Sequence, residues 1–182
     1  MGTYKSRLSP TLFLVMAVTI RQWKWDDLDN LVQYSNNINI WNQLRNYFPH
    51  PYTEEHGKAW LEKVVDKEPA INFAITLDDV AIGGIGLILN TDVYLMSAEV
   101  GYWLGEPFWG QGITTEAVRQ LVEYTFATFD IVRLYAEAFE SNKASMRVLE
   151  KNGFYLEGVR RKAVLKNGVL MDDYIWVKLR PW

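Results

Sequence analysis

A short glycine-containing loop, residues 109–115, is the part of the chain whose residue types and spacing point most directly to chemistry. It follows an apolar, aromatic run typical of a buried strand and precedes a helical pattern that reaches about Phe129. A loop in this position leaves backbone N–H groups free at the positive end of a helix dipole, where phosphate groups bind. Gly110 and Gly112 lack a Cβ, so a ligand can approach the main chain closely. The loop therefore predicts a phosphate or pyrophosphate site.

The loop matches neither of the two common phosphate-binding motifs. It lacks the lysine and the spacing of G-x-x-x-x-G-K-[ST], and it does not contain G-x-G-x-x-G. A tight turn between a strand and a helix also uses glycine for structural reasons alone. Taken by itself, the loop leaves both interpretations open.

A second segment contains Asn142 and Ser145, followed by a helical pattern that ends in Glu-Lys-Asn-Gly-Phe at residues 150–154. Together the two segments resemble the GNAT superfamily of acyl-CoA-dependent N-acetyltransferases. In that family the cofactor loop R/Q-x-x-G-x-G/A precedes an N-x-x-S motif and a short helix that ends in E-K-x-G-F. The resemblance extends over about residues 18–179 and includes features of the RimJ/RimL-like branch, which modifies ribosomal-protein N-termini.

The loop departs from the family pattern at its first and last positions. Trp109 stands where Arg or Gln is usual, and an aromatic residue is frequent there in the RimJ/RimL-like branch. Thr114 stands where Gly or Ala is usual. Its β-branched side chain either crowds the loop where the backbone meets a phosphate, which would weaken cofactor binding, or donates its hydroxyl to that phosphate.

The resemblance implies an α+β GNAT fold, with a central, mostly antiparallel twisted sheet flanked by helices. It implies a single domain over residues 1–182, with residues 1–10 as a loose extension, acetyl-CoA as the cofactor and no metal. In the family the strand before the loop diverges from its neighbour and pairs with the pantetheine arm, while the loop holds the pyrophosphate. The residues implied as cofactor-binding are Tyr102, Trp103, Leu104, Trp109, Gly110, Gln111, Gly112, Ile113, Thr114, Thr115, Asn142, Ser145 and Arg147.

The resemblance implies two catalytic residues, Glu99 and Ser145. Glu99 lies on the strand where many family members place a glutamate that removes a proton from the amine. The alternative for Glu99 is a structural hydrogen bond. Ser145 matches the position whose hydroxyl can give a proton to the departing CoA thiolate. Asn142 either binds the cofactor or caps a helix, and one asparagine can do both.

The acceptor site is expected to be lined by Trp41, Phe48 and Tyr52, because this segment lines it in the family. A core-packing role for Trp41 is equally open. Neutralising a lysine amine at pH 7 costs about 4–5 kcal/mol, whereas an α-amine costs about 1 kcal/mol. A single weak base therefore suits an α-amine, and we expect acetyl transfer to a peptide or protein N-terminus. The alternatives are a small-molecule amine, such as a polyamine, amino sugar or amino acid, and a catalytically silent acyl-CoA-binding module.

Composition narrows the class of protein further. Of the 182 residues, 49% are hydrophobic and 14% aromatic, which is typical of a packed globular domain. The net charge of −3 argues against DNA binding, and the absence of cysteine excludes disulfides and thiolate metal sites. An apolar run at residues 12–18 is too short to span a bilayer. We therefore expect no membrane partner and a cytoplasmic location, with homodimerisation, which is common in the family, left open.

Hydrophobic periodicity predicts the elements that must position these residues. A type I′ hairpin is expected at Asn167-Gly168, and the capping box at Thr53 is expected to be incomplete, since His56 replaces Glu or Gln. The expected helices are residues 26–34, 41–47, 53–67, 113–129 and 143–152. The family resemblance implies a first strand over about residues 16–23, and the other expected strands are residues 71–77, 80–89, 97–104, 132–139, 159–166 and 170–179.

Overall fold

The computed structural model describes residues 17–181, which fold into a seven-stranded sheet flanked by helices. The strands are β1 (Val18–Gln22), β2 (Asn72–Leu77), β3 (Val80–Leu89), β4 (Ser97–Leu104), β5 (Arg133–Phe139), β6 (Tyr155–Lys166) and β7 (Val169–Leu179). The helices are α1 (Leu28–Ser35), α2 (Ile38–Trp41), α3 (Glu54–Val64), α4 (Ile113–Thr128) and α5 (Lys143–Lys151). The strand order is β1-β2-β3-β4-β5-β7-β6, and every neighbouring pair is antiparallel except β4–β5. The α+β prediction is confirmed.

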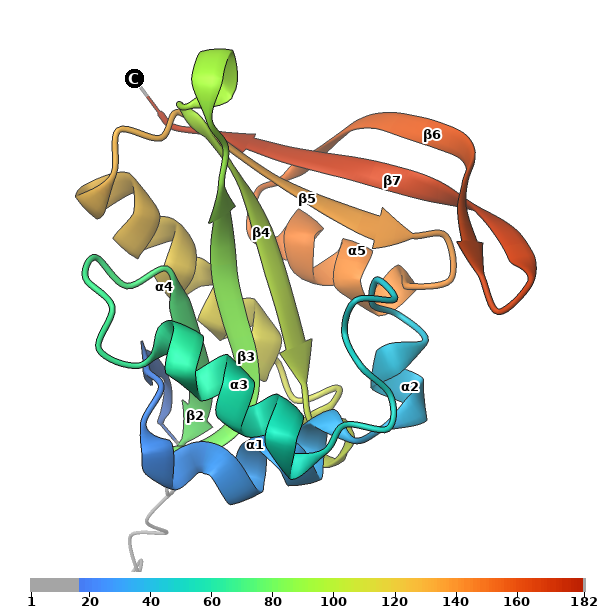
Figure 1. Cartoon of the computed structure of the whole chain (residues 1–182). Helices are drawn as coiled ribbons and strands as arrows, with labels where there is room; N and C mark the ends of the chain where they lie inside the picture. Colours follow the sequence, from blue (N-terminus) through green and yellow to red (C-terminus); the bar gives the residue numbers. More distant parts are fainter. Residues whose placement is uncertain (1–16, 182) are drawn as a thin grey trace, which may run out of the picture.

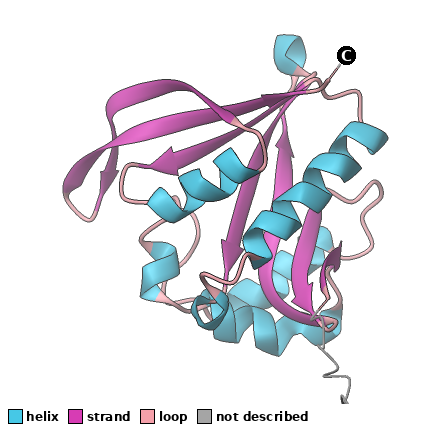
Figure 2. Ribbon diagram, turned by 180° about the vertical axis from the view of Figure 1, so that it is seen from behind, coloured by secondary structure: helices cyan, strands magenta, loops and turns pink. Residues whose placement is uncertain are grey.

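Helices cover both faces of the sheet (Figure 1). Helices α1 and α3 pack on one face, and α4 and α5 pack on the other, as the reverse view in Figure 2 shows. The larger apolar cluster joins α4, through Val118 and Leu121, to the sheet, and a smaller cluster joins α1 and α3 to it through Leu31 and Leu61. Among residues 17–181, no helix is long and apolar enough to cross a membrane.

The two parallel strands in the middle of the sheet diverge after only three residues. β4 pairs with β5 from Ser97 to Glu99, while its other edge stays paired with β3 as far as Leu104. Within the described part of the chain, the edge of β4 that faces β5 therefore has no strand partner from Val100 onward, and Figure 1 shows the gap between the ribbons widening. The expected divergence of the strand before the glycine loop is present, and it leaves backbone groups free to bind a ligand.

Two local expectations were wrong. α2 spans Ile38–Trp41, not residues 41–47, because the Asn37 side chain accepts from the N–H of Asn39 (2.8 Å) and thereby starts the helix earlier. The capping box of α3 is complete, because Nδ1 of His56 accepts from the Thr53 N–H at 3.1 Å. An imidazole nitrogen thus takes the place of the usual carboxylate.

Other boundaries shifted by a few residues. α3 ends at Val64 instead of residue 67, and β6 begins at Tyr155 instead of residue 159. Asn167 and Gly168 both have positive φ, 52° and 77°, which confirms the predicted I′ hairpin. The expectations for residues 1–10 and for the start of the first strand at residue 16 lie outside the described residues.

Candidate active site

Most of the predicted catalytic and acceptor residues line one cavity of about 590 Å³ at the opening between β4 and β5. Its walls come mainly from β3, β4 and β5, from α3, from the start of α5 and from the segment between α2 and α3. The predicted residues that it brings together are Phe48, Tyr52, Glu99, Tyr102, Trp103, Asn142 and Ser145. The cavity therefore places a carboxylate, three hydroxyls, an amide and several aromatic rings around one space.

Other predicted site residues lie outside the lining of this cavity. Trp41 and Leu104 are not among the lining residues, and neither is the glycine loop of residues 109–115, which begins beyond the end of β4. Arg147 is exposed on α5 and bonds to Glu150 at 3.3 Å. The structure thus separates a cavity next to β4 from a loop beyond the end of that strand.

The glycine loop has the geometry that a phosphate site needs. Gly110 and Gly112 have φ of 75° and 81°, and a Cβ built at either position would meet no atom within 4 Å. The first bond of α4 runs from the Glu116 N–H to the Gly112 carbonyl (3.1 Å), so the N–H groups of residues 113–115 precede it and have no intrahelical acceptor. The side chain of Ile113 is buried and anchors the loop to the core. These features fit a bound pyrophosphate.

The Trp109 side chain is hydrogen-bonded to the end of β4. Its indole N–H donates to the carbonyl of Leu104 at 2.7 Å, and 44% of the residue is exposed. Thr114 lies half-buried in the first turn of α4. The aromatic replacement at the first loop position is therefore accommodated by a bond to the preceding strand.

Asn142 and Ser145 are placed by the first turn of α5. The Asn142 Oδ1 accepts from the Ser145 N–H at 3.0 Å, so the asparagine is the N-cap of the helix. The cap uses only this oxygen, and the amide N–H groups of Asn142 stay available to a ligand in the cavity. The Ser145 hydroxyl lies 2.8 Å from the hydroxyl of Tyr102, whose pKa is raised by burial.

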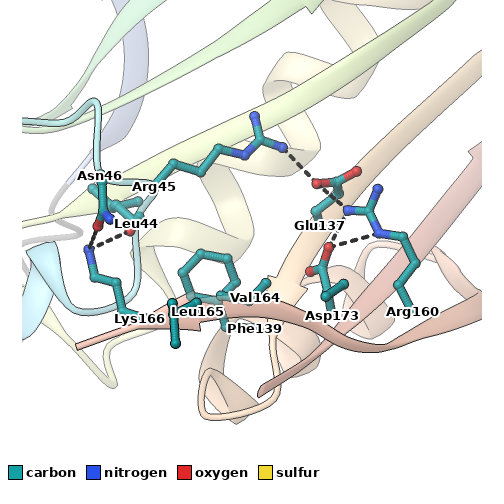
Figure 3. A pocket seen from close by; sticks show the side chains of 11 residues that line it. Leu44, Arg45, Asn46, Glu137, Phe139, Arg160, Val164, Leu165, Lys166 and Asp173 are labelled. Atoms are coloured by element: carbon teal, nitrogen blue, oxygen red, sulfur yellow. Dashed lines mark hydrogen bonds and ion pairs between the residues drawn. The ribbon is translucent and has the colours of Figure 1, made fainter. Parts of the chain in front are cut away.

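Glu99 was predicted, but it belongs to a chain of salt bridges that was not predicted from the sequence. Nη2 of Arg45 donates to Glu99 at 2.5 Å and to Glu137 at 2.7 Å, and Arg160 bonds to Glu137 at 2.6 Å and also to Asp173. Figure 3 shows the part of this chain from Arg45 to Asp173. Burial raises the pKa of Glu99, Arg45 opposes that shift, and the charge of Glu137 adds to it.

Sequence signals for these missed residues were weak. Glu137 stands between Ala136 and Ala138 in an otherwise largely apolar strand, and a lone carboxylate in such a strand indicates a cavity or a buried partner. Arg45 lies in a segment of turns, and only the folded chain brings it to β4 and β5.

The hairpin of β6 and β7 contacts the segment that carries Arg45 and holds it in place. The buried Lys166 ammonium donates to the Leu44 carbonyl at 2.9 Å and to Asn46 Oδ1 at 2.8 Å, and it lies 3.3 Å from the centre of the Trp41 ring. The Trp41 indole in turn donates to the Phe48 carbonyl at 2.9 Å. Leu44, Asn46 and Lys166 also line a second cavity of about 400 Å³ beside the first (Figure 3). Trp41 therefore supports the acceptor segment from outside the larger cavity.

Comparisons with known proteins agree with this geometry. A family model described as “Acetyltransferase (GNAT) domain” matches residues 17–155. A Bacillus subtilis (strain 168) protein named “Probable N-acetyltransferase YjcK” is 34% identical over 162 residues, which cover 86% of this chain and 90% of that protein.

Two solved structures show the same fold. The microcin C7 self-immunity acetyltransferase MccE, in complex with acetyl-CoA and AMP, has a TM-score of 0.77 and 26% identity over 90% of this chain and 92% of that one. RimL, a ribosomal L7/L12 alpha-N-protein acetyltransferase in complex with coenzyme A, has a TM-score of 0.78 and 22% identity over 89% of this chain and 93% of that one.

The diverging strands, the glycine loop at a helix start and the carboxylate-lined cavity define an enzyme that transfers acyl groups from coenzyme A to amines. The chain belongs to the GNAT acetyltransferases, and its relatives include a protein named “Ribosomal-protein-serine acetyltransferase” from Escherichia coli (strain K12), 31% identical over 83 residues that cover 46% of each chain. It is an acetyl-CoA-dependent N-acetyltransferase, in which acetyl-CoA supplies the activated acetyl thioester. The free edge of β4, the loop of residues 109–115 and the Asn142 amide are the groups that would hold this cosubstrate.

Proposed function

We propose that this acetyltransferase acts on the α-amine of a peptide or protein N-terminus, with Glu99 as the base that takes the proton from the acceptor. The observation that carries the proposal is the placement of Glu99 in the cavity wall, with its pKa raised by burial but restrained by Arg45. A carboxylate in this environment is a weak base. It suits an amine that gives up its proton at neutral pH for about 1 kcal/mol, as an α-amine does.

The aromatic wall of the cavity supports a peptide acceptor. The rings of Phe48 and Tyr52 are tilted by 33° with their centres 5.3 Å apart, and the ring centre of Phe48 lies 6.2 Å from that of Trp103. These rings offer flat apolar surface along which the first residues of a chain can lie. RimL, which has the same fold, is named for acetylation of a protein α-amine.

The Ser145 hydroxyl is proposed to return a proton to the leaving thiolate. It lines the cavity beside Asn142, and it is hydrogen-bonded to the Tyr102 hydroxyl at 2.8 Å. When the Tyr102 hydroxyl donates, the Ser145 oxygen accepts, and the O–H of Ser145 is free to point into the cavity. The two proposals thus place the base, Glu99, on β4 and the acid, Ser145, on α5.

The test is a comparison of acceptors at pH 7, with release of coenzyme A as the measurement. One peptide carries a free α-amine and a blocked lysine, its counterpart carries a blocked α-amine and a free lysine, and spermidine and a free amino acid represent small amines. We expect kcat/KM on the α-amine to exceed that on the lysine amine by about 10²-fold, which follows from their different pKa values. A higher kcat/KM on the lysine peptide or on spermidine would refute the proposal. Binding of acetyl-CoA without turnover of any amine would favour a catalytically silent module.

A further inference from the structure

One guanidinium nitrogen joins two acidic side chains inside the active-site cavity. Nη2 of Arg45 donates to Oε1 of Glu99 at 2.5 Å and to Oε2 of Glu137 at 2.7 Å. All three residues line the cavity, and Figure 3 shows the Arg45 side chain extended from its loop toward Glu137. Because the acceptor nitrogen must come close to Glu99 to lose its proton, the arginine stands in the space that this nitrogen has to enter.

The strand register explains why the two carboxylates share one cation. Glu99 on β4 is level with Tyr135 on β5, and Glu137 follows two residues later on the same side of β5. The strands part at this level, so both side chains point into the opening, where they are 14% and 17% exposed. Two carboxylates so close to each other repel unless a positive charge lies between them.

The Arg45 side chain can leave this position without a change in its backbone. It is 36% exposed and belongs to a segment of turns. The backbone on either side is fixed, because Lys166 donates to the Leu44 carbonyl and to the Asn46 side chain. Rotation about the arginine side-chain bonds is therefore enough to vacate the place between the carboxylates.

A primary ammonium group can make the same bonds as the guanidinium nitrogen. It has the same charge and three N–H donors, so it can bind both carboxylates at once. We propose that the acceptor ammonium binds between Glu99 and Glu137 in the place of the Arg45 guanidinium, so that Arg45 is an internal competitor of the acceptor. The site then selects alkyl amines that arrive as cations and rejects alcohols and arylamines, which are uncharged at pH 7.

The surrounding charges decide which carboxylate receives the proton. The groups that face Glu99 are Arg45 from the loop, Glu137 from β5 and, farther away, Arg160 from β6. Arg160 bonds to Glu137 at 2.6 Å, so Glu137 keeps a cation and stays ionised after Arg45 has left. Glu99 loses its one bonded cation and becomes the better base. One proton passes from the ammonium nitrogen to the Glu99 carboxylate, which leaves a neutral amine and a neutral Glu99.

This inference rests on the proposed function only in its use of Glu99 as the base, and its test uses whichever amine of the panel is turned over best. Kinetics are compared for the unchanged protein, Arg45→Ala, Arg45→Lys and the control Arg119→Ala, which removes an exposed arginine from its salt bridges on α4. Arg45→Ala is expected to lower the acceptor KM by about fivefold or more, the lower end of typical coupling between two sites. Arg45→Lys and Arg119→Ala are expected to leave it near the original value.

Methylguanidinium provides the decisive measurement, because it restores the missing cation without the side chain. We expect it to inhibit Arg45→Ala competitively against the amine and not against acetyl-CoA, and to have little effect on the unchanged protein. A rise in the acceptor KM of Arg45→Ala would show that Arg45 binds the acceptor, and would overturn the inference. So would the absence of competition by methylguanidinium.

The same comparison can be made without turnover. Calorimetric titration of the amine into the coenzyme A-loaded protein should give tighter binding to Arg45→Ala than to the unchanged protein, and equal or weaker binding would contradict the inference. The α-amine proposal fails on a different result, a preference for lysine amines in the acceptor panel. Faster turnover of lysine amines would leave the Arg45 comparison intact.

Discussion

The carboxylate of Glu99 lies between opposing influences, and their balance sets the pH at which it can accept a proton. Burial raises its pKa from the ordinary 4.5, the Arg45 guanidinium lowers it, and the negative charge of Glu137 raises it again. The net direction is upward, as is common for a catalytic base. A base must be ionised to act, so activity is lost as the pH falls through the raised pKa.

A pH profile of kcat/KM tests this assignment. We expect an acid limb above pH 4.5, a shift of that limb to higher pH in Arg45→Ala, and loss of the limb in Glu99→Gln together with a fall in kcat/KM of about 10²-fold or more. The control is Glu123→Gln, which changes an exposed glutamate on α4. An unchanged pH profile in Glu99→Gln would show that a group other than Glu99 accepts the proton.

At the residue scale, the sequence predicted groups that belong to a motif and missed groups that depend on the fold. Glu99, Asn142 and Ser145 could be named because each lies at a fixed place relative to the two motifs, and all three line the cavity. Arg45 and Glu137 are 92 positions apart in the chain. Their salt bridge exists only because β5 lies beside β4 and the segment after α2 crosses above them, which no local pattern records.

At the scale of elements, the glycine loop and α4 act as one unit. Gly110 and Gly112 adopt left-handed conformations that glycine reaches at little cost, and these conformations turn the chain into the first turn of the helix. A larger side chain at Gly112 would both strain the backbone and fill the space where a phosphate would lie. Its effect on cofactor binding has to be separated from the strain.

Gly168 allows that separation. It has φ of 77°, close to the 81° of Gly112, and a Cβ built there also meets no atom within 4 Å, but it lies at the tip of the β6–β7 hairpin. We expect Gly112→Trp to weaken acetyl-CoA binding by at least about 10²-fold, equivalent to the loss of one or two good charged hydrogen bonds, as measured by calorimetry. Gly168→Trp should lose similar stability and keep its affinity. Equal loss of affinity in both variants would place the cofactor elsewhere.

Elements with strong periodicity were predicted well, and elements controlled by single polar contacts were not. β3 and β4 have the predicted limits, because each is a long apolar run between clear turn residues, which fix where the strand begins and ends. α2 was misplaced because the Asn37 cap, one side chain, decides where it starts. The early start of β6 at Tyr155 depends on pairing with Val177 of β7, which a one-dimensional pattern does not contain.

At the scale of the whole molecule, the active site is a consequence of an incomplete sheet. β1 to β4 form one part of the sheet and β5 to β7 the other, and three residue pairs, from Ser97–Arg133 to Glu99–Tyr135, join them. Each part has its own helix cover, with α4 on the first and α5 on the second, and the two helices also touch. The opening was expected from the family resemblance, whereas the charged bridge across it was not.

A ligand that lies in this opening should bind both parts and so stabilise the chain as a whole. At a concentration 100 times its Kd, acetyl-CoA adds about 2.7 kcal/mol to the free energy of unfolding. For a chain of this length that corresponds to a rise in Tm of about 5–10 °C. We expect this rise in thermal unfolding of the unchanged protein and of Gly168→Trp, and its absence in Gly112→Trp.

Hydrogen exchange shows whether the stabilisation crosses the opening. Because coenzyme A would contact β4 and the loop on one side and Asn142 on the other, its binding should slow exchange in β4, in the first turn of α4 and in α5 alike. Protection confined to β4 and α4, with exchange in α5 unchanged, would mean that the ligand binds one part of the sheet only. The Asn142 amide would then be a helix cap and nothing more, and the expected bridge between β4 and α5 would not form.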